Sequence, residues 1–151
     1  MRLTKIVKVD PLNIKEDYIR EAADVLRAGG LVIIPTETVY GLAANMRNKK
    51  ATQRLYEIKQ RPEGKTFSIA IDRQERVEEF ARDIPKAAYK LIDKFWPGPL
   101  TLVLKGINQL SVGLRMPDNE IALRVIAQTM HPVILPSANL SGEPAPVSFE
   151  E

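Results

Sequence analysis

Two stretches of the sequence, Leu31-Val32-Ile33-Ile34-Pro35-Thr36 and Val133-Ile134-Leu135-Pro136-Ser137, share one pattern: an apolar run stops at a proline, and a hydroxyl side chain follows. Short, largely β-branched runs of this kind are typical of strands buried on both faces, as in parallel α/β sheets. Such sheets bind ligands beyond the carboxyl ends of their strands. The polar segments that follow the two runs, 36–41 and 137–139, are therefore predicted to open onto one crevice.

Length and composition limit the classes of protein to which the chain can belong. Its 151 residues, 44% of them hydrophobic, match one domain with a substantial core. There is no cysteine, which excludes disulfides, thiolate metal sites and a cysteine nucleophile. Residues 1–9 interleave charged and apolar residues instead of forming a signal-peptide core, and no apolar run is long enough to span a bilayer. We expect a single-domain, cytoplasmic protein with no membrane partner.

Hydrophobic periodicity predicts an alternation of helices and strands. The expected helices cover residues 13–28, 49–59, 72–82, 85–95 and a segment that includes 121–126. Their expected capping residues are Asn13, Asn48, Asp72, and Asp118 or Asn119. The expected strands cover residues 3–9, 31–34, 66–71, 100–104, 112–116 and 133–135. This order favours a mixed α/β sheet.

The tripeptide Lys59-Gln60-Arg61 lies at the expected end of the helix over 49–59. Its two cations, two positions apart, can converge on one anion only if the helix unwinds between them, which Pro62 favours. A lysine point charge beside a forked arginine suits a polyphosphate or a carboxylate. Alternatively, both cations complement the negative end of the helix, an interaction worth roughly 0.3 to 1 kcal/mol. The tripeptide alone favours this second interpretation.

Three other polar residues have ordinary interpretations when each is taken alone. Arg115, at the end of an expected strand, is either an inward cation or a surface residue. Ser137 and Asn139 either offer hydroxyl and amide groups to a ligand or cap a turn through bonds to the backbone. Taken singly, these residues favour the structural interpretations.

Gly64-Lys65-Thr66 imitates the tail of a phosphate-binding P-loop. That motif requires a glycine five positions before the second glycine, where this sequence has Lys59. The P-loop also joins a strand to a helix, whereas this segment is expected to join a helix to a strand. We therefore reject a P-loop here.

In combination, and in this order, five segments are far more specific: Pro35-Thr36-Glu37-Thr38-Val39-Tyr40-Gly41-Leu42, Lys59-Gln60-Arg61-Pro62, Trp96-Pro97-Gly98-Pro99-Leu100-Thr101, Arg115-Met116-Pro117 and Pro136-Ser137-Ala138-Asn139. The sequence resembles the threonylcarbamoyl-AMP synthases, the YrdC-like family, from about Asp10 onward. The resemblance implies a twisted mixed α/β sheet with flanking helices around a large basic cavity. It also implies an enzyme that makes threonylcarbamoyl-AMP and pyrophosphate from L-threonine, bicarbonate and ATP, for the threonylcarbamoyladenosine modification of tRNA position 37.

The resemblance also implies roles for individual residues. The expected catalytic residues are Lys59 and Arg61. The expected ATP ligands are Lys59, Arg61, Lys65, Ser137 and Asn139. The expected threonine ligands are Thr36, Arg61, Arg115 and Ser137. No residue is expected to ligate a metal directly, and Mg²⁺ would bind through the ATP phosphates. Since the carbamate of threonine supplies the nucleophile, the protein need only position the substrates and stabilise charge.

The remaining expectations concern the extent of the domain and the partners of the protein. Ser148 and Glu151 have the spacing of a capping box, so the chain stops in what should be the first turn of a helix. We therefore expect one catalytic domain over residues 1–151 that lacks the family's C-terminal strands. A tRNA-modifying transferase complex would use the product. The alternative is a non-catalytic double-stranded RNA-binding module, although the formal charge of +3 supports RNA binding only weakly.

Overall fold

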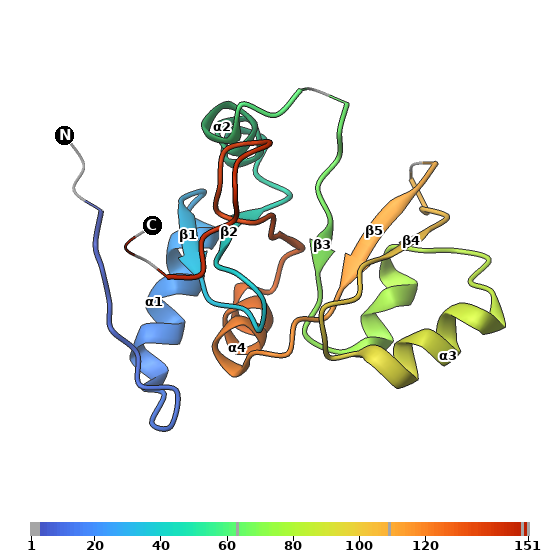
Figure 1. The fold of residues 1–151 in the computed structure, drawn as a ribbon, viewed down its shortest axis with the longest axis horizontal. Helices are drawn as coiled ribbons and strands as arrows, with labels where there is room; N and C mark the ends of the chain where they lie inside the picture. Colours follow the sequence, from blue (N-terminus) through green and yellow to red (C-terminus); the bar gives the residue numbers. More distant parts are fainter. Residues whose placement is uncertain (1–3, 63, 109, 149, 151) are drawn as a thin grey trace.

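A six-stranded mixed sheet organises the computed structural model, which describes residues 4–62, 64–108, 110–148 and 150 (Figure 1). The strands are β1 (Leu31–Ile34), β2 (Gly41–Asn45), β3 (Ile69–Ala70), β4 (Leu102–Leu104), β5 (Val112–Arg115) and β6 (Val133–Ile134). The helices are α1 (Glu16–Arg27), α2 (Lys49–Lys59), α3 (Lys86–Phe95) and α4 (Glu120–Thr129), with a 3-10 helix η1 (Gln74–Glu79). The expected mixed α/β sheet is confirmed.

The strand order is β1-β2-β6-β3-β5-β4. Within the described part of the chain, β3 and β5 form a parallel pair and the other neighbours are antiparallel. The prediction that the two proline-stopped runs lie in a parallel sheet was therefore wrong. However, β1 and β6 are both antiparallel to β2, so they run in the same direction on its two sides. The loops that follow β1 and β6 therefore still emerge at the same end of the sheet.

The prediction that both runs are buried on both faces holds for only one of them. In β6, Val133 and Ile134 are buried, whereas in β1 the Ile33 side chain is 55% exposed. The reason is position, since β1 ends the strand order while β6 is central. An apolar run alone does not distinguish these two places.

Two hydrophobic clusters, one on each face of the sheet, contain the core. Successive residues of a strand point to opposite faces, and Ala43 and Ala44 accordingly belong to different clusters, as do Ile69 and Ala70. Residues of α1 and α4 pack in one cluster, and residues of α2 and α3 pack in the other. The sheet is therefore covered by helices on both faces (Figure 1).

Local capping signals had mixed success. Asn48 and Asn119 cap α2 and α4 as predicted, their side chains accepting from the amides of residues 51 and 122 at 3.0 and 3.1 Å. Asn13 does not cap α1, whose N-cap is Lys15, and Asp72 precedes a 3-10 helix instead of the expected helix over 72–82.

Near the start of the chain the structure differs from the prediction, and near its end the prediction falls partly outside the described residues. Residues 4–9 form no strand, although residues 3–9 were expected to, and residue 3 lies outside the described residues. The turn predicted for residues 148–151 includes positions 149 and 151, which also lie outside them. In the described residues, no helix has the length and apolar character needed to cross a membrane.

The paired strands β4 and β5 supply a matched test of the core. Val112 in β5 is 2% exposed and Val103 in β4 is 71% exposed. We expect Val112→Ala to lower the free energy of unfolding by about 2 kcal/mol, because it removes two buried carbon atoms and leaves a cavity. Val103→Ala should change it by less than about 0.5 kcal/mol. Urea unfolding of both variants measures the difference, and equal losses would contradict the burial of this face.

Candidate active site

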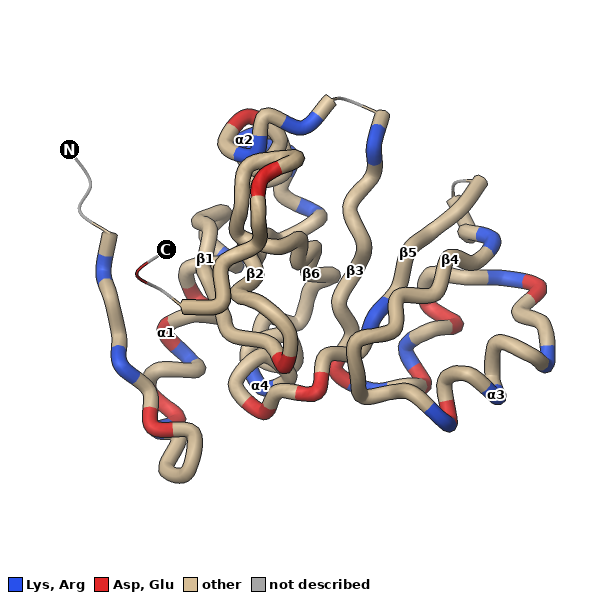
Figure 2. Tube along the Cα trace, in the orientation of Figure 1, with Lys and Arg blue, Asp and Glu red and all other residues tan. Residues whose placement is uncertain are grey.

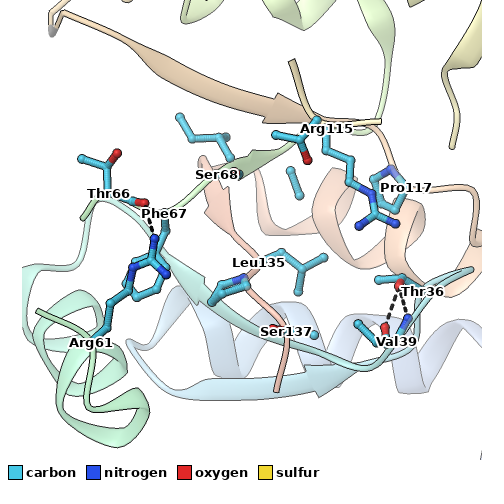
Figure 3. Close-up of a pocket in the computed structure, with 15 residues that line it drawn as sticks. Thr36, Val39, Arg61, Thr66, Phe67, Ser68, Arg115, Pro117, Leu135 and Ser137 are labelled. Atoms are coloured by element: carbon cyan, nitrogen blue, oxygen red, sulfur yellow. Dashed lines mark hydrogen bonds between the residues drawn. The ribbon is translucent and has the colours of Figure 1, made fainter. Parts of the chain in front are cut away.

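A cavity of about 310 Å³ lies between the segment after β1, the strand β3 and the segment after β6. Its polar lining includes Thr36, Arg61, Ser68, Arg115 and Ser137. Figure 3 shows these side chains around the pocket, with Arg61 on one side and Thr36 on the other. We call this the first cavity. The sequence predicted a crevice at the strand ends. The first cavity also extends along β3, so it is not confined to those ends.

The Thr36 hydroxyl shapes the loop that leaves β1. It accepts from the amides of Thr38 and Val39 at 3.3 and 3.2 Å and lies 2.6 Å from the Val39 carbonyl oxygen, to which it donates. These bonds form a tight side-chain turn, a common role for threonine after a strand. Thr36 therefore lines the first cavity with a hydroxyl that is already engaged in the loop.

Arg115, the last residue of β5, joins the opposite wall of the first cavity to this loop. Its Nη2 donates to Glu37 Oε1 at 2.6 Å and to Thr38 Oγ1 at 3.0 Å, and its Nε donates to the Gly98 carbonyl at 3.2 Å. The two ionised side chains are mostly buried, with 23% and 19% exposed. Arg115 is thus an inward cation rather than a surface residue. Three of its five N–H groups are occupied.

A second cavity of about 260 Å³ adjoins the first. Arg61, Pro136 and Ser137 line both cavities. The polar residues that line only the second are Lys59, Lys65, Asn139 and Ser141. The two cavities therefore share a wall that consists of Arg61 and the segment after β6.

The end of α2 places the two cations of the Lys59-Gln60-Arg61 motif. The helix ends at Lys59, and Gln60 adopts a left-handed conformation with φ of 49°. This is the unwinding that the sequence required for both cations to reach one region. Arg61 then donates from Nε to the Lys65 carbonyl at 2.8 Å and from Nη2 to the Thr66 carbonyl at 3.0 Å.

Arg61 is also held by an aromatic ring. Its guanidinium carbon lies 4.9 Å from the centre of the Phe67 ring, which packs against Tyr56 at 4.5 Å. Cation–π contact and two hydrogen bonds fix the plane of the guanidinium while leaving some of its five N–H groups free.

Lys59 is the buried cation of the site, with only 3% of its surface exposed. Its Nζ donates to the carbonyl oxygens of Ser137 and Asn139 at 2.5 and 2.6 Å. Burial, and in second place the neighbouring charge of Arg61, lowers the pKa of Lys59 below its ordinary value. The side-chain hydrogen bonds of Lys59 and Arg61 go to carbonyls of residues 137, 139, 65 and 66 and not to those of α2, which argues against a helix-end role for the pair.

The segment after β6 pairs with the loop after β1. Gly41 and Ser137 form an isolated antiparallel bridge, and the Leu42 amide donates to the Pro136 carbonyl at 2.8 Å. Asn139 Nδ2 donates to the carbonyls of residues 140 and 143, while its buried Oδ1 has no hydrogen-bond partner in the described structure. Ser137 and Asn139 thus take part in backbone turns and also line cavities.

Positive charge predominates among the residues that line the two cavities. The cationic lining residues are Lys59, Arg61, Lys65 and Arg115, and no described lining residue is acidic. Figure 2 shows lysine and arginine positions on α2 and on the segment that follows it. Such a lining favours anionic groups.

All seven sequence-predicted site residues line one cavity or both. The first cavity has the four expected threonine ligands, and the second has the five expected ATP ligands. The sequence did not identify Thr66, Phe67, Ser68 and Thr101 as lining residues. Thr66 and Ser68 belong to the expected strand over 66–71, where period-two alternation could have marked them as one face.

Comparisons with known proteins find close relatives. A family model for the Sua5, YciO and YrdC proteins, described as "Telomere recombination", matches residues 24–151. Threonylcarbamoyl-AMP synthase of Pyrococcus abyssi is 44% identical over an alignment of 144 positions, which covers 89% of this chain and 42% of that protein. Threonylcarbamoyl-AMP synthase of Bacillus subtilis is 38% identical over an alignment of 153 positions, which covers 93% of this chain and 44% of that protein.

The fold agrees with these relatives. The crystal structure of P. abyssi Sua5 complexed with L-threonine matches with a TM-score of 0.86 at 44% identity, over 91% of this chain and 43% of that one. The chain therefore spans less than half the length of these relatives. Since the family model covers most of its residues, the chain belongs to the Sua5/YciO/YrdC family.

Proposed function

We propose that the chain is the catalytic domain of an L-threonylcarbamoyladenylate synthase, which forms threonylcarbamoyl-AMP and pyrophosphate from L-threonine, bicarbonate and ATP. The observation that carries the proposal is the shared wall of the two cavities. Residues expected to bind threonine line the first cavity, residues expected to bind ATP line the second, and Arg61 and Ser137 belong to both. Two substrates in these cavities would meet at those two side chains.

The proposed chemistry requires positioning more than a protein nucleophile. The amine of threonine takes up carbon dioxide derived from bicarbonate and loses a proton, which gives a carbamate. A carbamate oxygen then bonds to the α-phosphorus of ATP while the bond to the pyrophosphate leaving group breaks. Charge on the phosphorus oxygens grows in this step, and fixed cations such as Arg61 and Lys59 would stabilise it.

Mg²⁺ would enter this reaction as part of the nucleotide. The described residues contain no group of three histidine, cysteine, aspartate or glutamate side chains that could hold a metal ion. The ATP phosphates supply the oxygen ligands that Mg²⁺ prefers, and water completes its shell. The lysines and Arg61 of the second cavity would then bind phosphate oxygens that the ion leaves free.

The product would serve the modification of tRNA position 37 in the cytoplasm. Threonylcarbamoyl-AMP is a mixed anhydride, so a transferase must take the acyl group before water does. We propose that a tRNA-modifying transferase complex accepts the product. Weak RNA binding by this chain would assist the transfer without being required for the synthase step.

The reaction itself is the first test. With ATP, Mg²⁺, L-threonine and bicarbonate, the protein should release pyrophosphate, and omission of either threonine or bicarbonate should stop the release, because the carbamate is the nucleophile. A coupled pyrophosphate assay measures this. Release that needs neither compound would refute the assignment. RNA affinity that falls steeply with salt, together with no ATP binding, would favour the RNA-binding alternative.

The second test concerns Arg61. We expect Arg61→Ala to lower kcat/KM by about 100-fold or more, because it removes a fixed cation between the two substrates. Arg61→Lys keeps the charge but loses the planar fork and should recover only part of the loss. Arg54→Ala is the matched control, since Arg54 is an exposed arginine of α2 outside both cavities.

Steady-state kinetics and thermal unfolding of each variant distinguish function from fold. Arg61→Ala should retain a cooperative unfolding transition near that of the Arg54→Ala control. Equal activity of the two variants would show that Arg61 has no part in the reaction.

A further inference from the structure

Lys59 connects α2 to the segment after β6 by three hydrogen bonds. Its Nζ donates to the carbonyl oxygens of Ser137 and Asn139, and its own carbonyl oxygen accepts from the Ser141 amide at 2.9 Å. All three partners of Lys59 belong to residues 137–141, which we call the shared loop. One buried side chain therefore holds the backbone of this loop at two residues, Ser137 and Asn139.

The orientation of the two carbonyls governs the side chains of the shared loop. Because the peptide groups are planar, fixing the carbonyls of Ser137 and Asn139 toward Lys59 limits the directions of their side chains. Ser137 lines both cavities, whereas Lys59 is among the described residues that line the second cavity but not the first. The loop thus gives Lys59 a structural route to the first cavity, which Lys59 itself does not line.

The donor count of the ammonium supports this role. An ammonium group has three N–H donors, and the two backbone carbonyls use two of them. At most one donor remains for a phosphate oxygen in the second cavity. Arg61 and Lys65 line the same cavity, and their side chains are not bound to the shared loop in the described structure.

We propose that Lys59 is a positioning residue that orients the shared loop and thereby couples the nucleotide cavity to the threonine cavity. The inference rests on the proposed function and goes beyond it, since the sequence assigned Lys59 only to ATP and catalysis. A residue that served only as a phosphate ligand would affect ATP. A positioning residue affects threonine binding even when no nucleotide is present.

The experiment measures L-threonine affinity without nucleotide by calorimetry. Lys59→Met should weaken threonine binding by about tenfold, a size usual for coupling between two sites. Lys65→Met, in the same cavity but without contact to the shared loop, should weaken ATP binding and not threonine binding. Lys50→Met, an exposed lysine of α2, should change neither. Lys59→Arg keeps N–H donors at this position and should recover part of the threonine affinity.

Two outcomes separate this inference from the proposed function. If the unaltered protein binds neither threonine nor ATP, the proposed function fails. If it binds both, and Lys59→Met binds threonine as tightly as Lys50→Met does, the positioning role is overturned.

A measurement on the unaltered protein covers the case in which Lys59→Met does not fold. L-threonine alone should shift the backbone amide resonance of Ser141, which donates to Lys59 and lines only the second cavity. An unchanged Ser141 resonance at saturating threonine would contradict the coupling.

Discussion

The site depends on one constraint of the sheet: β1 and β6 run in the same direction on the two sides of β2. Both proline-stopped strands therefore release their hydroxyl-bearing loops on one side, where the Gly41–Ser137 bridge joins them. Other elements attach to this pair of loops. Arg115 reaches the first loop from β5, and Lys59 reaches the second from the end of α2. Loss of the strand arrangement would separate all of these contacts at once.

Two of the local capping signals in the sequence predicted helix starts correctly, because their physical cause is itself local. Asn48 and Asn119 accept from amides three positions away, so the sequence contains both partners. The direction of strand pairing is not local. The run over 31–34 has the same apolar character whether it is a central parallel strand or an edge strand, and the exposure of Ile33 follows only from the complete sheet.

The combination of motifs predicted seven residues that line the two cavities, although each motif alone favoured a structural role. What the sequence could not show is how the cations are held. The acceptors of Lys59 are backbone carbonyls 78 and 80 positions away. Every residue has a backbone carbonyl, so a sequence motif cannot indicate which one accepts. Arg61 likewise binds carbonyls, in a segment where the sequence predicted a longer strand than β3. Side-chain types were therefore predictable, and their partners were not.

The partners of the cations differ between the two cavities, which bears on the ligands that we propose for each. Arg115 has an acidic partner in Glu37, so part of its charge is already neutralised at the first cavity. Among the described residues, Lys59, Arg61 and Lys65 form no ion pair, and the side chains of Lys59 and Arg61 donate to neutral carbonyls. The lowered pKa of Lys59 reflects burial and the unrelieved charge of Arg61. A ligand with several negative charges relieves more of this repulsion than a single carboxylate does, which supports our proposal of a triphosphate in the second cavity and an amino acid in the first.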